Sequence, residues 1–150
     1  TIDKQLRFSR GEIITFAHLS HDDNPLHQDA QAAQRARFGE IIASGQHSAS
    51  VLMGALATHF SRQDDGLRRE MLCLNMNFAF KEPVFADQDL RLHWRVASVE
   101  WKSRLGGALA QLDGTLSVAH ARPSVISRAT ILIKEAVDAV GGRVVIRSNQ

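Results

Sequence analysis

One apolar segment followed by a run of alternating residues constrains the fold of this chain most. Residues 46–60 are apolar on nearly every side of a helix, a pattern typical of a helix that is buried all round. Past Met71 the period of the apolar residues changes from about 3.6 to about 2, the period of a strand. A buried helix followed by strands predicts the α+β class, with an antiparallel sheet covering one central helix.

The alternating part of the chain predicts an antiparallel sheet. The first strand pattern stops before Pro83, which lacks the N–H that a sheet ladder needs. The predicted strands are residues 72–80, 90–96, 111–118 and 127–134. Beyond them, residues 137–150 are expected to form a tail or a short extra strand, so residues 1–136 are predicted to be one domain.

Two short helices are predicted ahead of the apolar one. Ser9 and Glu12 have the spacing of a capping box, which predicts a helix over residues 11–18. Asp29 has the position of an N-cap for a second helix over residues 30–37, where alanine and arginine favour helix.

Composition narrows the function classes. The 150 residues carry a net charge of +2 and no block of Lys or Arg, so nucleic-acid binding is not indicated. A single cysteine, Cys73, excludes an intrachain disulfide, and we expect it to be a small buried residue in a reducing compartment. No apolar run reaches the roughly 18 residues of a membrane span, and the first residues carry no secretory pattern, so we expect a cytoplasmic protein without membrane contact.

The segment from residue 18 to residue 45 carries the chemistry. It begins H-L-S-H-D-D-N-P-L-H-Q-D and ends F-G-E-I-I-A-S-G. Asp22 stands five residues before His27, and Asn24-Pro25 between them predicts a loop. Gly45 follows His27 by eighteen residues and opens the apolar helix. A carboxylate, an imidazole and the electropositive start of a helix are groups that add or remove water beside an activated carbonyl.

This segment, together with F-x-F-K-x-P-V at residues 78–84, resembles the MaoC-like acyl dehydratases and (R)-specific enoyl-CoA hydratases. The resemblance covers Phe8 to Lys134. It implies a hotdog fold, in which a curved antiparallel sheet wraps a long central helix, and a homodimer or higher homo-oligomer. The implied activity is that of a hydro-lyase, which hydrates trans-2-enoyl-CoA or dehydrates 3-hydroxyacyl thioesters of CoA or acyl carrier protein.

The same resemblance implies a role for individual residues. Asp22 and His27 are the implied acid–base pair, and the backbone N–H of Gly45 is the implied donor to the thioester oxygen. Asn24 matches the asparagine of the motif and is placed at the substrate site, chiefly as a residue that shapes the loop. His47 is also expected at the substrate site, because it lies in the first turn of the helix beside the predicted pocket. The implied chemistry uses no metal and no redox cofactor, because the thioester itself is the substrate.

The chain departs from the family pattern at two places. Enoyl hydratases commonly read H-G-M at the start of the helix, whereas this chain reads Ser44-Gly45-Gln46-His47. After Pro83-Val84, Ala86-Asp87 replaces the usual P-G turn. The first departure borders the implied acyl pocket and leaves the substrate open, and the second we expect to be a changed turn.

Each of these residues also has a purely structural interpretation. Asp22 and Asn24 are of types that commonly cap turns, and His47 also fits a hydrogen-bonded interior histidine. The segment gathers residue types that ligate metals: His18, His21, Asp22, Asp23 and His27. Their spacing matches no HExxH-type site, so a metal is not predicted.

Two other functions remain open from the residues alone. A hotdog acyl-CoA thioesterase would also use a carboxylate and a helix start, but against the thioester carbon. A non-catalytic subunit that binds acyl thioesters would retain the fold without turnover. The Asn-Pro-Leu-His turn argues against the thioesterase, and the presence of both Asp22 and His27 argues against the binding subunit.

Overall fold

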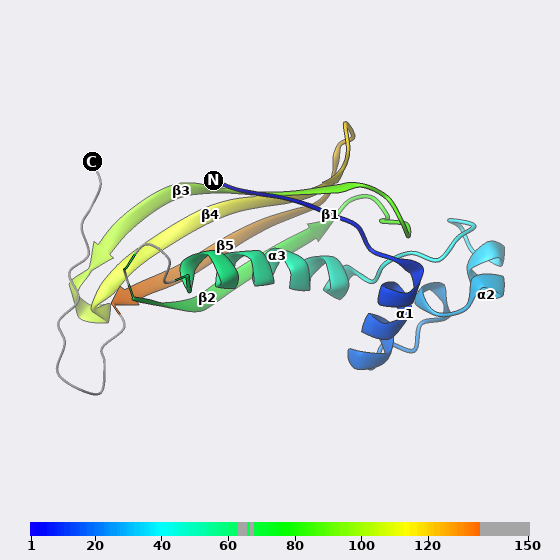
Figure 1. Ribbon diagram of the computed structural model, residues 1–150, viewed down its shortest axis with the longest axis horizontal. Helices are drawn as coiled ribbons and strands as arrows, with labels where there is room; N and C mark the ends of the chain where they lie inside the picture. The colour runs from blue at the N-terminus through cyan, green and yellow to red at the C-terminus, as the bar shows by residue number, and fades with distance from the viewer. Residues whose placement is uncertain (63–65, 67, 136–150) are drawn as a thin grey trace.

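The computed structural model describes residues 1–62, 66 and 68–135 as a curved sheet with one long helix against its concave face (Figure 1). The strands of the described part are β1 (Ile2–Leu6), β2 (Arg69–Phe80), β3 (Leu90–Lys102), β4 (Gly107–Val118) and β5 (Pro123–Glu135). Their order across the sheet is β1-β3-β4-β5-β2, and every neighbouring pair is antiparallel. The predicted α+β architecture is therefore confirmed.

The long helix α3 (Gly45–Phe60) lies along the sheet, and the smaller helices lie beyond its N-terminal end (Figure 1). These smaller elements are α1 (Arg10–Leu19), the 3-10 turn η1 (Pro25–His27) and α2 (Ala30–Arg35). A second 3-10 turn, η2 (Ser103–Leu105), joins β3 to β4. The start of α3 is thus the place where the sheet, the helix and the N-terminal segment meet.

The predicted helix caps are present. The Ser9 hydroxyl accepts the N–H of Glu12 at 3.1 Å, and the Glu12 carboxylate accepts the N–H of Ser9 at 2.9 Å. The Asp29 carboxylate accepts the N–H groups of Gln31 and Ala32, as expected for the N-cap of α2. These side chains satisfy donors that have no partner inside a helix, which fixes where each helix begins.

The four predicted strands are confirmed, and each is longer than its apolar pattern. The sequence analysis did not predict β1, a five-residue strand with a polar centre that pairs with the first residues of β3. A register shift between Cys73 and Asn75 interrupts the alternation of β2. The predicted tail over residues 137–150 lies outside the described residues.

Two predictions of burial were wrong. Helix α3 is buried on one face, because a single sheet covers it, and Met53 on its other face is 41% exposed. Cys73 is exposed, because it lies on β2 at the outer edge of the sheet beside the register shift. Among the described residues, no helix is long and apolar enough to cross a membrane.

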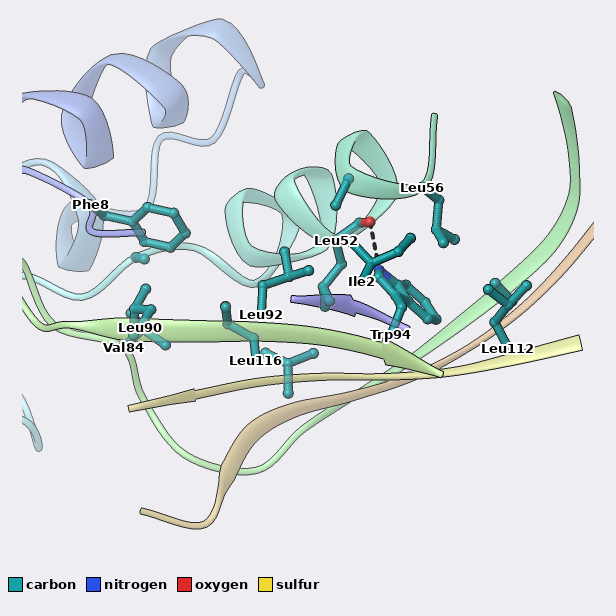
Figure 2. Packing of buried hydrophobic residues seen from close by; sticks show 14 of the residues in the cluster. Ile2, Phe8, Leu52, Leu56, Val84, Leu90, Leu92, Trp94, Leu112 and Leu116 are labelled. Carbon is teal, nitrogen blue, oxygen red and sulfur yellow. Dashed lines mark hydrogen bonds between the residues drawn. The ribbon is translucent and has the colours of Figure 1, made fainter. Parts of the chain in front are cut away.

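Trp94 of β3 fixes the position of α3 on the sheet (Figure 2). Its ring is fully buried, and its indole N–H donates to the backbone carbonyl of Leu52 at 3.0 Å. On the neighbouring strand, Gly114 leaves room for the ring, since a Cβ atom there would lie 2.5 Å from two ring carbons. The absence of a side chain at Gly114 therefore allows the tryptophan to reach the helix.

Helix α1 is packed against the start of α3 through His47. The imidazole is stacked between Phe8, with ring centroids 4.1 Å apart, and Phe16, at 4.5 Å. Its Nδ1 atom is buried and has no hydrogen-bond partner among the described residues. Burial lowers the pKa of His47 below the ordinary value of 6.5, although the Glu12 carboxylate partly opposes this effect. The folded chain therefore holds this imidazole in its neutral form more strongly than the unfolded chain does.

Replacing Gly114 by alanine is expected to destabilise the fold by about 1–3 kcal/mol, because the new methyl group displaces the Trp94 ring. Urea unfolding followed by tryptophan fluorescence measures this change. The matched control is Gly54→Ala on the exposed face of α3, where a Cβ atom meets nothing within 4 Å. That substitution is expected to stabilise the helix by about 0.5–1 kcal/mol. Equal effects at the two glycines would contradict the packing argument.

Replacing His47 by phenylalanine is expected to make stability less dependent on pH below the ordinary histidine pKa of 6.5. In the wild type the unfolded chain binds this proton more readily, so the free energy of unfolding falls as the pH drops below that value. The variant cannot bind the proton, and it also removes an unpaired buried nitrogen, which costs about 1–3 kcal/mol.

Urea unfolding at about pH 8 and about pH 5 compares the His47→Phe variant with the wild type on both sides of the titration. Gln34→Ala, at an exposed position of α2 that carries no titratable group, is the control and should behave as the wild type does. If His47→Phe kept the wild-type difference in stability between the two pH values, the pH dependence would not come from His47.

Candidate active site

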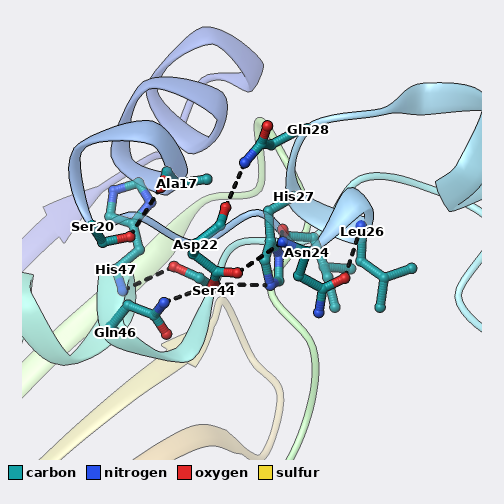
Figure 3. A network of polar contacts seen from close by, with 11 residues as sticks. Ala17, Ser20, Asp22, Asn24, Leu26, His27, Gln28, Ser44, Gln46 and His47 are labelled. Atoms are coloured by element: carbon teal, nitrogen blue, oxygen red, sulfur yellow. Dashed lines mark hydrogen bonds and ion pairs between the residues drawn. The ribbon is translucent and has the colours of Figure 1, made fainter.

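Asp22 is placed by the way α1 ends. The backbone N–H of Asp22 donates to the carbonyl of Ala17 at 2.8 Å, directly after His21 adopts a left-handed φ of 57°. This turn ends the helix and directs the chain toward the start of α3 (Figure 3). The side chain of Gln28 also donates to the backbone carbonyl of Asp22. Hydrogen bonds at both its N–H and its carbonyl therefore fix the backbone of Asp22, independently of the contacts that its carboxylate makes.

Asn24 shapes the loop between the carboxylate and the imidazole. Its backbone N–H donates to Asp22 Oδ1 at 3.0 Å, and its own side-chain oxygen accepts the N–H of Leu26 at 3.1 Å. Pro25 then begins η1, the turn that carries His27. The contacts of Asn24 agree with its predicted role as a loop former, and a direct contact with substrate stays a prediction.

His27 is buried and has a defined tautomer. Its Nδ1 lies 2.6 Å from the backbone carbonyl of Ile42, and a carbonyl oxygen only accepts hydrogen bonds, so Nδ1 carries a proton. In the neutral ring Nε2 then has a free lone pair, and it lies 3.7 Å from Asp22 Oδ2. The backbone N–H of Ile42 donates to the carbonyl of Leu26 at 3.2 Å. The imidazole is thereby tied to the segment that leads into α3.

The structure brings the predicted pair together without a direct hydrogen bond between them. A separation of 3.7 Å is longer than the 2.7–3.2 Å of an N–H···O bond. The side chains are 9% exposed for His27 and 19% exposed for Asp22, so both groups are largely removed from solvent. A carboxylate oxygen and an imidazole nitrogen at this spacing can both accept from one water molecule or one hydroxyl group.

The start of α3 supplies donors next to this pair. Ser44 is the N-cap, and its hydroxyl accepts the N–H of His47 at 3.3 Å. The N–H groups of Gly45 and Gln46 stand at the first two helical positions, where an α-helix offers no acceptor of its own. The partial positive charge of the helix start adds to their attraction for an anionic oxygen.

Gly45 is packed closely against the ring of Phe80. A Cβ atom on Gly45 would lie 3.0 Å from the nearest carbon of that ring, closer than side chains normally pack. Phe80 ends β2 and is 55% exposed, so the ring covers the helix start from the sheet side. A side chain at Gly45 would require the Phe80 ring to shift by a few tenths of an ångström, so the close approach of the ring favours glycine at this position.

Gln46 makes a contact that the sequence analysis missed. Its side-chain amide donates to Asp22 Oδ2 at 2.6 Å, across 24 positions of the chain (Figure 3). The visible signal was the departure from H-G-M, since a glutamine donates where a methionine cannot. From the sequence alone, that departure bears on the acyl pocket and does not indicate a contact with the carboxylate.

The remaining predicted residues lie apart from this pair. The ring of His47 sits between Phe8 and Phe16 and borders an open cleft of about 410 Å³, so its role toward substrate stays a prediction. Asp23 is exposed and has no contact with His27 among the described residues. In the same part of the chain, no group of three or more His, Cys, Asp or Glu side chains is arranged to hold a metal ion.

Comparisons with known proteins place this geometry in a family. The family described as MaoC like domain matches residues 2–110. A mitochondrial 3-hydroxyacyl-acyl-carrier-protein dehydratase of Solanum lycopersicum is 26% identical over 121 residues, which cover 77% of this chain and 68% of that protein. The (R)-specific enoyl-CoA hydratase of Aeromonas caviae is 30% identical over 93 residues, which cover 62% of this chain and 65% of the hydratase. The match to that hydratase spans less than two thirds of its length.

The solved structure of the (R)-hydratase from A. caviae, described as involved in PHA biosynthesis, matches with a TM-score of 0.74. The two chains are 24% identical in that alignment, which covers 90% of this chain and 93% of the other. This likeness confirms the hotdog fold that the sequence resemblance implied. Because the family match extends over more than half of its residues, the chain belongs to the MaoC-like domain family.

Proposed function

We propose that this protein is a hydro-lyase that adds water to a trans-2-enoyl thioester, or removes it from a 3-hydroxyacyl thioester. The observation that carries the proposal is the pair of acceptors, Asp22 Oδ2 and His27 Nε2, 3.7 Å apart beside the N-terminus of α3. Membership of the MaoC-like domain family supports hydration or dehydration of acyl thioesters. The proposed substrate is a thioester of CoA or acyl carrier protein.

In the proposed hydration, Asp22 removes a proton from the water molecule while His27 holds that water in place. The water oxygen bonds to C3, and the electrons of the double bond move toward the thioester carbonyl. The proton that Asp22 has taken up is then delivered to C2, supported by His27, which completes the addition and regenerates the carboxylate. General acid–base groups typically contribute about 10²–10⁴-fold to such a rate. Dehydration follows the same steps in reverse.

The charge that develops on the thioester oxygen is assigned to the start of α3. The N–H of Gly45, at the first position of the helix, is the proposed donor. Loss of one such donor typically costs about 10²–10³ in rate. The proposed mechanism uses no metal and no redox cofactor. Neither step is an oxidation or a reduction, and the N–H groups are proposed to stabilise the charge on the thioester oxygen.

A second copy of the chain is proposed as the partner. Strand β2 stands at the edge of the described sheet, and Leu74 on it is 51% exposed. An exposed apolar edge strand is a pairing site unless something covers it. The uncovered face of α3, with Met53, is a further apolar surface on the same subunit. We therefore propose a homodimer or a higher homo-oligomer.

Asp22→Asn is expected to lower the rate of hydration of short and medium trans-2-enoyl-CoAs by about 10²–10⁴-fold, because the amide cannot accept the proton. The decay of enoyl absorbance measures the rate. The fold should persist, since the side-chain oxygen of asparagine still accepts the N–H of Asn24. Asp23→Asn, at the exposed neighbouring carboxylate, is the control and should retain the wild-type rate.

The same assay separates the alternatives. Release of free thiol by the wild type would assign the protein to the thioesterases. Tight binding of acyl-CoA without turnover at any chain length would assign it to the binding subunits. Equal loss of hydration in the Asp22 and Asp23 variants would reject Asp22 as the base.

Sedimentation velocity is expected to give a mass of at least twice 16.6 kDa for the wild type. Leu74→Lys should raise the dissociation constant by about tenfold or more, because a charge is then buried at the paired edge. Leu19→Lys, at an exposed leucine of α1, is the control and should leave association unchanged. A monomeric wild type at micromolar concentration would refute the proposed partner.

A further inference from the structure

Gln46 reaches from the first turn of α3 to the carboxylate of Asp22. The distance from Gln46 Nε2 to Asp22 Oδ2 is 2.6 Å, which is short for a bond between an amide and a carboxylate. Gln46 is exposed, whereas the side chains of Asp22 and His27 are largely buried. The amide therefore lies beside the carboxylate of Asp22, at the oxygen that faces His27 (Figure 3).

The two oxygens of Asp22 have different donors. Oδ1 accepts the backbone N–H of Asn24 at 3.0 Å, and Oδ2 accepts the amide of Gln46. Oδ2 is also the oxygen that lies 3.7 Å from His27 Nε2. The terminal torsion of an aspartate is soft, so one donor alone leaves the carboxylate free to rotate. Two donors on opposite oxygens fix which oxygen faces the imidazole.

The position of this amide is set by the helix that carries the proposed oxyanion donor. Gln46 is the second residue of α3 and follows Gly45 directly. A shift of the helix along its axis therefore moves the N–H of Gly45 and the amide of Gln46 together. The hydrogen bond transmits that position to Asp22, so that the carboxylate keeps a constant distance from the helix start.

We propose that Gln46 is a positioning residue, which holds Asp22 Oδ2 toward His27 and in register with the N-terminus of α3. The inference rests on the proposed hydro-lyase function. It gives Gln46 no contact with the reacting atoms. Its contribution is to keep the base, and the water between the base and the imidazole, at a fixed place relative to the thioester carbonyl.

Two substitutions of Gln46 test whether its hydrogen bond positions Asp22 or whether its side chain only fills space. Gln46→Met has a similar length and no donor, and should lower kcat by about 10-fold with KM changed by less than about 2-fold, because misplacement of a reacting group reduces rate. Gln46→Glu has nearly the same shape, but it places a carboxylate oxygen against the carboxylate of Asp22. Because the two negative charges repel each other, this variant should lower kcat by about 100-fold. Gln31→Met, the same substitution at an exposed glutamine of α2, is the control and should match the wild type.

The relative kcat values of the two Gln46 variants test the proposal. A structural role of the glutamine side chain would be retained in Gln46→Glu, which preserves its shape, so wild-type kcat in that variant overturns the proposal. An effect confined to KM would mean that Gln46 binds substrate directly, and this also overturns it. A tenfold loss in Gln46→Met with a larger loss in Gln46→Glu supports it.

A second measurement tests the contact without any turnover. Gln46→Met should lower the melting temperature by about 1–3 °C in the wild-type background. In an Asp22→Ala background the same substitution should have no effect, because the acceptor is gone. Equal shifts in both backgrounds would overturn the contact. Inactivity of the wild type, with this coupling intact, would instead reject the hydro-lyase function and retain the hydrogen bond.

Discussion

The packing of α3 on the concave face of the sheet is the contact on which the candidate site depends. Trp94 donates to the carbonyl of Leu52, seven residues after Gly45, and Gly114 makes room for the ring. Seven helical residues span about 10 Å, so this one bond sets how far the start of α3 projects beyond its anchor. The N–H groups proposed to hold the thioester oxygen are therefore positioned by a side chain of the sheet.

The other half of the site is built from local turns and then tied to that helix. The end of α1 and the Asn24 turn place Asp22 and His27 through contacts within a few residues of each. Ile42 joins this loop to the segment before α3, with one bond from the imidazole and one to Leu26. Gln46 joins it to the helix itself. The candidate site thus lies where the N-terminal loop segment and helix α3 meet.

Local patterns predicted those segments well and the contacts between them poorly. Capping residues such as Ser9 and Asp29 and the change of period after Met71 are properties of neighbouring residues, so the helices and strands followed from them. The spacing of Asp22, His27 and Gly45 indicated the site through its resemblance to a family. The exposure of Met53 and the bond from Gln46 to Asp22 depend on what packs opposite, which no periodicity records.

The bond between Gln46 and Asp22 also bears on which carbon of a thioester the water reaches. In the proposed mechanism the helix start fixes the carbonyl oxygen, and hydration needs the water at C3, two bonds beyond the carbonyl carbon that a thioesterase attacks. Gln46 belongs to the same helical turn as the oxyanion donor, so it fixes the base relative to that oxygen. A base held at one distance cannot serve both carbons equally well. In the proposed mechanism, the hydrogen bond from Gln46 to Asp22 therefore favours attack at C3 over attack at the carbonyl carbon.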